Sequence, residues 1–262
     1  MITLTVETAT KLLEHNTLNR PISDVHVQRI ARQIAQGKWR FNGDTIKVSE
    51  DGDVLDGQHR LWAVIEAKKP VDTIIVYGIA RDAFATIDTL RRMRSGADVL
   101  ALNGVSRYRQ PVCSALQWLL RWQRDVIETW RAPQNRIENA DVEECYVAHP
   151  AIVNSVERTM RLRGLANPGV MAFLYYVFAN HNEEIAERMI STLEDPSGVS
   201  VDDPFFRLRM YFTADHYRRK DPLTIIALTI KAANAAAAGK EIQLLAWRQQ
   251  GQHPEAFPTL QF

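Results

Sequence analysis

The sequence predicts an α+β fold, in which an N-terminal mixed α/β domain is followed by an α-helical domain. Strand-like runs and helical runs alternate over roughly the first third of the chain. After about Asp82 the strand signals nearly vanish, and apolar residues recur at helical spacing. No low-complexity linker separates the two parts. We therefore expect domains over residues 1–82 and 83–262, the second ending in a short extended tail.

The first domain is expected to form a small mixed sheet with two or three helices. Ile2–Val6 alternates like a strand, and Ser23 is a suitable N-cap for an amphipathic helix. The turn Glu50–Asp53 connects two short apolar runs in the manner of a β-hairpin. In chain order the expected elements are strand 2–6, helix 23–36, hairpin strands 44–48 and 54–55, a helix ending near residue 67, and strand 73–77.

The second domain is expected to be helical almost throughout. The helical periodicity is clearest between Tyr108 and Trp130. Glu241–Trp247 is expected to be either one last strand or an extended tail, and the tail from Gly251 is expected to be irregular. The predicted helices cover residues 108–130, 139–148, 152–163, 168–179, 183–193, 202–217 and 222–238.

Composition and charge bear on three properties: nucleic-acid binding, the state of the cysteines and membrane insertion. With 32 basic and 31 acidic residues the net charge is +1. The chain therefore has no overall basic excess that would indicate nucleic-acid binding, although a local basic patch remains compatible with it. Cys113 and Cys145 lack metal-type spacing and are expected to be reduced core residues. The most apolar late stretch contains Lys231 and Asn234, which favours a buried helix over a membrane span. We expect a cytoplasmic protein without a membrane partner, in an oligomeric state that the sequence leaves open.

The most informative stretch runs from Val54 to Ala63. It reads as a short strand, a tight Asp-Gly turn and a helix whose first turn carries His59 and Arg60. Cations normally favour helix C-termini, so cations at this end suggest that an anion is held there. Exposed backbone N–H groups at such a junction bind phosphate, and glycine at position 57 lets a ligand approach. The alternative is an ordinary turn with Asp56 as N-cap and a solvated His-Arg pair.

The pentapeptide Asp56–Arg60 resembles the second sequence box of the ParB/sulfiredoxin superfamily, in the Asp-Gly-Gln-His-Arg form common in phage and prophage proteins. Asn19–Pro21 resembles the first box, and the elements between the two boxes follow in the expected order. The resemblance implies a ParB/sulfiredoxin-like domain that binds nucleotide phosphates. It assigns the nucleotide to Asn19, Arg20, Gly57, Gln58, His59 and Arg60.

The resemblance also limits the chemistry. Gln58 stands where sulfiredoxins carry their catalytic cysteine, so the sulfur chemistry cannot carry over. Gln58 and His59 also depart from the acidic residue and arginine run of the chromosome-partitioning members, which puts a CTP-gated DNA clamp in doubt. Kinase-like members use a carboxylate as general base. Here Asp56 and Asp88 are the candidates, with His59 as a further catalytic group and no dedicated metal ligands.

Each of these residues also has a purely structural interpretation. Asp56 could cap a helix, and Asp88 could pair with Arg91 or Arg92. The run Arg91, Arg92 and Arg94 could bind phosphate or nucleic acid, or form a solvated helix face.

Taken together, the sequence and the resemblance predict a nucleotide-dependent enzyme of phage-type nucleic-acid metabolism or modification. It would be a phosphotransferase or a nucleotide hydrolase that uses ATP or CTP, with or without Mg²⁺. Nucleotide and DNA, or another nucleic acid, are the expected partners. Two alternatives stay open, a non-catalytic nucleotide-regulated nucleic-acid-binding module and a scaffold that binds a protein partner.

Overall fold

The computed structural model describes residues 1–16, 21–82, 95–214, 221–249 and 253–262. The chain divides into two compact units, Met1–Met93 and Arg94–Phe262. The first is a mixed α/β unit and the second is helical, so the α+β class is confirmed. The domain boundary expected after residue 82 stays a prediction, because residues 83–94 lie outside the described part.

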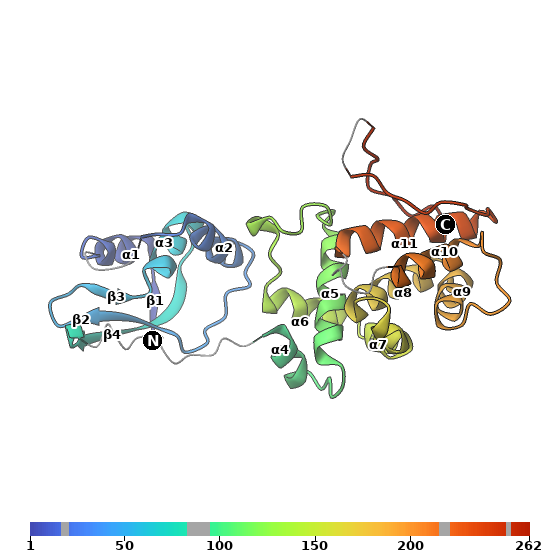
Figure 1. Ribbon diagram of the computed structural model, residues 1–262. Helices are drawn as coiled ribbons and strands as arrows, with labels where there is room; N and C mark the ends of the chain where they lie inside the picture. Colours follow the sequence, from blue (N-terminus) through green and yellow to red (C-terminus); the bar gives the residue numbers. More distant parts are fainter. Residues whose placement is uncertain (17–20, 83–94, 215–220, 250–252) are drawn as a thin grey trace. The chain divides into compact units, whose positions relative to one another are not determined.

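The first unit is a four-stranded mixed sheet with three helices on one face (Figure 1). The sheet order is β1-β4-β2-β3, in which β2 and β4 are parallel and the other two pairs are antiparallel. The elements are β1 (Ile2–Leu4), α1 (Val6–Leu13), α2 (Asp24–Ala35), β2 (Thr45–Ser49), β3 (Val54–Asp56), α3 (Gln58–Ala67) and β4 (Val71–Ile79).

Alternation along β2 separates the two faces of this sheet. Ile46 and Val48 are fully buried and belong to the core of the unit, while Lys47 between them belongs to the opposite face. The predicted helix over residues 23–36 is confirmed as α2, which buries Val27, Ala31 and Ile34. The hairpin of β2 and β3 is also confirmed.

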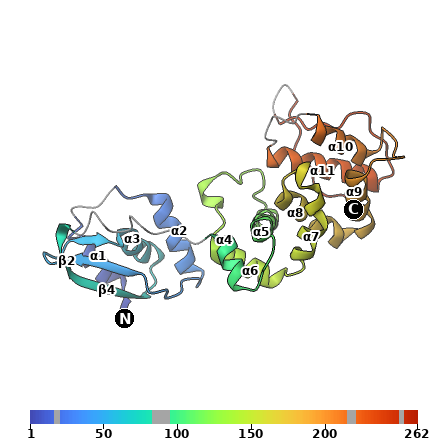
Figure 2. The ribbon, with the colours of Figure 1, turned by 60° about the horizontal axis from the view of Figure 1, so that its bottom comes forward.

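The second unit is a bundle in which α8 lies between α5, α7 and α9 (Figure 2). Helix α8 is buried on nearly every side, which explains its run of apolar residues from Val170 to Phe178. The helices are α4 (Gly96–Leu102), α5 (Arg109–Gln123), α6 (Asn139–Ala148), α7 (Ile152–Thr159), α8 (Pro168–His181), α9 (Glu183–Glu194), α10 (Pro204–Thr213) and α11 (Pro222–Ala237), with short 3-10 helices η2 (Pro133–Asn135) and η3 (Met160–Gly164).

The predicted helix over residues 108–130 was wrong at its C-terminal end. Helix α5 ends at Gln123, and Asp125 adopts a left-handed backbone with φ of 52°. The N–H of Val126 then donates to Arg121 O at 2.9 Å, so the chain turns back on itself. Trp130 returns to stack edge-on against Trp118, with ring centroids 5.2 Å apart. Trp130 therefore packs against the core at a sequence position that fits helical spacing, although it does not lie in a helix.

Three further differences concern short elements. Helices α1 and α4 were not expected, although Thr5 and Ser95 cap them by accepting hydrogen bonds from Thr8 N and Asp98 N. Helix α10 ends at Thr213, short of the predicted residue 217, and residues 215–220 lie outside the described part.

Glu241–Trp247 forms no strand in the part of the chain that the structure describes and belongs to an extended tail, the second of the two expectations. The tail is fixed along α11 by Lys231, whose Nζ lies 2.5 Å from Ala246 O and 2.6 Å from Glu255 Oε2. The ring of Phe262 packs against that of Phe178 at 5.6 Å.

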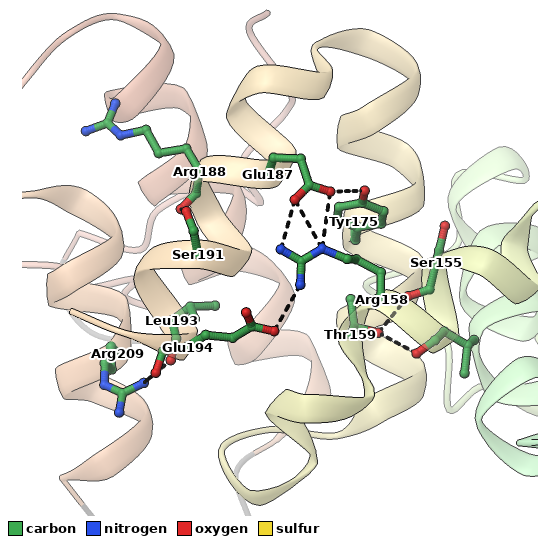
Figure 3. Close-up of polar contacts among 11 residues, drawn as sticks. Ser155, Arg158, Thr159, Tyr175, Glu187, Arg188, Ser191, Leu193, Glu194 and Arg209 are labelled. Carbon is green, nitrogen blue, oxygen red and sulfur yellow. Dashed lines mark hydrogen bonds and ion pairs between the residues drawn. The ribbon is translucent and has the colours of Figure 1, made fainter. Parts of the chain in front are cut away.

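A polar network joins α7, α8 and α9 (Figure 3). Arg158 points between Glu187 and Glu194 and forms ion pairs of 2.9 Å with each. Tyr175 also donates its hydroxyl hydrogen bond to Glu187. Burial of the phenol raises the pKa of Tyr175 to about 12, and the hydrogen bond to Glu187 is the second-largest cause. The hydroxyl therefore stays protonated and remains a donor. The hydrogen bond from Arg158 lowers the pKa of Glu187. All four groups are paired with one another, which indicates a structural role.

Across the described ranges, none of the helices has the length and apolar character required to cross a membrane.

Candidate functional site: the turn between β3 and α3

Gly57 forms the junction between β3 and α3 and has a left-handed backbone, with φ of 98°. Its carbonyl accepts from the N–H groups of Arg60 and Leu61 at 2.9 and 3.1 Å, which starts the helix. A Cβ added at this position would lie 2.9 Å from Ile46 Cγ1 and 3.3 Å from Arg60 Nη2. The turn therefore requires glycine, both for its backbone conformation and for its close approach to β2.

Three charged side chains meet beside this turn, and we call Lys47, Asp56 and Arg60 the charged cluster. Lys47 Nζ lies 2.5 Å from Asp56 Oδ2, and Arg60 Nη2 lies 3.7 Å from the same oxygen. Arg60 Nη2 also donates to Thr45 O at 2.6 Å. The three side chains are 17–21% exposed. Two cations therefore share one carboxylate in a half-buried setting at the start of α3.

The second terminal nitrogen of Arg60 has a different environment. Arg60 Nη1 is buried and has no hydrogen-bond partner among the described residues. Buried donors are nearly always paired in native proteins, so an unpaired guanidinium nitrogen marks a place where an acceptor is missing. No side chain caps the α3 N-terminus within the described part of the chain, and the first turn of the helix carries no acidic residue.

Gln58 and His59 are buried and contact a different part of the chain. Gln58 Oε1 accepts from Asn16 Nδ2 at 3.1 Å, and His59 Nε2 accepts from the N–H of Ser23 at 3.2 Å. His59 Nε2 must be unprotonated to accept this hydrogen bond. The ring of His26 lies edge-on to that of His59 with centroids 4.8 Å apart. Asn16 and Ser23 therefore both lie against the Asp56–Arg60 motif.

The structure brings some of the predicted site residues together and leaves others undescribed. Asp56 and Arg60 share the charged cluster, while Gln58 and His59 face the segment that connects α1 to α2. Six residues lie outside the described part, so their roles stay predictions: Asn19, Arg20, Asp88, Arg91, Arg92 and Arg94.

Sequence reasoning missed Lys47 and Asn16. Lys47 was visible as a charged residue between two apolar ones in a strand, a pattern that places it on the face opposite the core. Its pairing with Asp56 depends on the register of β2 against β3, which a bulge after Lys47 alters.

The described residues fit neither a metal site nor cysteine chemistry. Within the described ranges, no group of three or more His, Cys, Asp or Glu residues could hold a metal ion. Burial raises the pKa of Cys113, and burial raises that of Cys145 to about 11. Both thiols therefore stay protonated near neutral pH, which makes them poor nucleophiles.

Comparison of the chain with protein-family models, curated proteins and solved structures finds no match.

Proposed function

We propose that this protein binds a nucleotide through its phosphates at the Asp56–Arg60 turn and acts in phage-type nucleic-acid metabolism or modification. The observation that carries the proposal is the charged cluster at the N-terminus of α3. Lys47 and Arg60 together balance only one carboxylate there, and Arg60 Nη1 lacks an acceptor in the described part. A phosphate is the anion that suits such a place best, because guanidinium, ammonium and the helix N-terminus all favour it.

The proposed ligand is a nucleoside triphosphate, ATP or CTP, as the superfamily resemblance implies. In this proposal Lys47 and Arg60 bind the phosphate oxygens, and the backbone near Gly57 approaches them. Asn19 and Arg20 would contribute from the segment whose two flanks touch Gln58 and His59. A bound triphosphate supplies a transferable phosphoryl group, and Mg²⁺ would accompany it where the chemistry needs it.

The leading version of the proposal is a nucleotide-dependent phosphotransferase or hydrolase. Asp56 or Asp88 would accept a proton from the attacking hydroxyl or water, with His59 as a further candidate. For Asp56 this role requires release from Lys47, because its Oδ2 already lies 2.5 Å from Lys47 Nζ. That contact favours the second version, a non-catalytic module in which nucleotide regulates binding to DNA or another nucleic acid.

Thermal unfolding with ATP and CTP, each with and without Mg²⁺, tests nucleotide binding directly. A ligand that binds only the folded state at a hundredfold excess over its Kd stabilises it by about 2.7 kcal/mol. Lys47→Met should weaken nucleotide binding about tenfold or more, since it removes one charge-assisted contact worth roughly 1.5–3 kcal/mol. Lys69→Met is the matched control, because Lys69 lies in the same unit and, among the described residues, donates only to Ala35 O.

Two results would overturn the proposal: no stabilisation by any nucleotide, or equal losses for Lys47→Met and Lys69→Met. A nucleotide-hydrolysis assay with and without DNA then separates the two versions. Turnover supports the enzyme, whereas nucleotide-dependent DNA binding without turnover supports the regulated module.

A further inference from the structure

Among the described residues of the helical unit, Arg121 in α5 is the only buried arginine. Four other arginines of this unit form close ion pairs with carboxylates. The pairs are Arg124–Asp141 at 2.9 Å, Arg158–Glu187 at 2.9 Å, Arg188–Asp203 at 2.5 Å and Arg207–Asp202 at 2.5 Å. Arg121 is only 8% exposed, yet among the described residues no carboxylate and no hydrogen-bond acceptor contacts it. Its Nε is completely buried.

Two indole rings hold the Arg121 guanidinium in place. Its Cζ lies 4.9 Å from the ring centroid of Trp118 and 5.6 Å from that of Trp130. A second guanidinium, that of Arg131, lies 4.7 Å from the Trp130 centroid and forms an ion pair with Asp221 at 2.7 Å. Aromatic faces attract a cation, but they do not satisfy its N–H donors as an oxygen would. The guanidinium is therefore oriented and still lacks acceptors among the described residues.

Burial of the Arg121 guanidinium has an electrostatic cost. Burial lowers the pKa of Arg121, because the charged form loses hydration that no described anion replaces. A buried charge without a partner is expensive to maintain, whereas a buried charge that receives an anion is strongly favoured. The rigid fork of a guanidinium matches the oxygen spacing of a phosphate.

We propose that Arg121, which lies against the rings of Trp118 and Trp130, binds a phosphate group. A phosphate carries more charge than a carboxylate, which suits a guanidinium that has no acceptor among the described residues. The phosphate could belong to a small phosphorylated molecule or to a nucleic-acid backbone. The site lies entirely within the helical unit and is independent of the turn between β3 and α3.

The test compares wild type with Arg121→Met in thermal unfolding, with inorganic phosphate titrated against chloride at constant ionic strength. Wild type should gain stability saturably with phosphate. Arg121→Met should match or exceed the wild-type melting temperature without phosphate, because it removes an unpaired buried charge, and should lose at least tenfold in phosphate affinity. Arg124→Met is the matched control and should keep the phosphate response, since Arg124 is paired with Asp141.

A purely structural Arg121 gives the opposite pattern. Arg121→Met would then melt several degrees below wild type, through loss of the two indole contacts, with its phosphate response intact. If Arg121→Met does not fold, Arg121→Lys replaces it and should keep the charge but lose most of the phosphate affinity. Wild type that shows no saturable phosphate binding by calorimetry overturns the proposal in any case.

A short DNA oligonucleotide as competitor distinguishes the two sources of phosphate, because it displaces inorganic phosphate efficiently only if the backbone of a nucleic acid is the ligand.

Discussion

Lys47 Nζ lies 2.5 Å from Asp56 Oδ2, and the two residues face each other across the antiparallel pair of β2 and β3. The strand that ends in the Asp56–Arg60 motif is thus fixed to its neighbour by a half-buried ion pair. Because Arg60 Nη2 is 3.7 Å from the same oxygen, Asp56 positions both cations of the charged cluster. The same carboxylate would compete with any anion that binds there.

Asp56→Asn should separate positioning from catalysis. The substitution leaves Lys47 and Arg60 close together without an anion, so the unliganded protein should lose about 1–3 kcal/mol of unfolding free energy. Nucleotide affinity should hold or improve, because the competing carboxylate is gone. If Asp56 is the general base, hydrolysis should fall by roughly a hundredfold or more.

Urea denaturation and a nucleotide titration measure the two effects. Asp51→Asn is the control, since Asp51 forms a longer and more exposed pair with Arg81 at 3.8 Å, of a kind that contributes about 1 kcal/mol or less. A stable Asp56→Asn protein that no longer binds nucleotide would argue against a competing role for the carboxylate.

Gly57→Ala should destabilise the fold more than Gly52→Ala does. Both glycines have a left-handed backbone, with φ of 98° and 92°, and alanine there costs about 1–2 kcal/mol. Only at Gly57 would the new Cβ also meet another strand, at 2.9 Å from Ile46 Cγ1, whereas at Gly52 nothing lies within 4 Å. The difference between the two variants in urea denaturation therefore isolates the contact with β2. Equal losses would mean that the junction relaxes freely.

The sequence predicted the order of elements around the motif because each left a local signal. The stripe of Val27, Ala31 and Ile34 identified α2, and the Asp51-Gly52 turn identified the hairpin. Helix α1 left a weak signal, since it buries only Ala9 and contains two threonines and a valine that favour strands. Helix α4 carried a Ser95–Asp98 capping box that was readable in the sequence and was overlooked.

The candidate site was less predictable, because its contacts are long-range. The cations in the first turn of α3 predicted that an anion is held there. The structure shows that Asp56 already supplies a negative charge to Arg60, and that the carbonyl of Thr45 accepts a hydrogen bond from it. Asp56 is four residues before Arg60, but the contact with Thr45 could not be deduced without the sheet register, which a one-residue slip would change completely. Arg60 is therefore a structural partner of β2 whatever its ligand, and Arg60→Ala is expected to destabilise the unliganded fold.

Neither cysteine should react quickly in the folded protein. Cys113 and Cys145 are buried, and burial raises the pKa of both thiols, that of Cys145 to about 11. Reaction with a thiol reagent at pH 8 should be roughly a hundredfold slower in native protein than in urea, because it requires opening of the helical unit. A thiol that reacts at the unfolded rate without denaturant would contradict this burial.

The stability of the helical unit should depend on pH through Glu187. The hydrogen bond from Arg158 lowers the pKa of Glu187 in the folded state, with a smaller contribution from Tyr175. A carboxyl whose pKa is lower when folded stabilises the protein fully above its unfolded-chain pKa of about 4.3, and that contribution is lost as the pH falls through the folded value. Since the Glu187 side chain is 42% exposed, solvent screening limits the effect to about 1 kcal/mol at pH 7.

Glu187→Gln should therefore reduce the free energy of unfolding at pH 7 and have little effect near pH 3, as measured by urea denaturation at each pH. Glu157→Gln on the exposed side of α7 is the control and should change the free energy of unfolding little. A Glu187→Gln loss that is equally large at both pH values would show that the network acts through packing and not through the charge of Glu187.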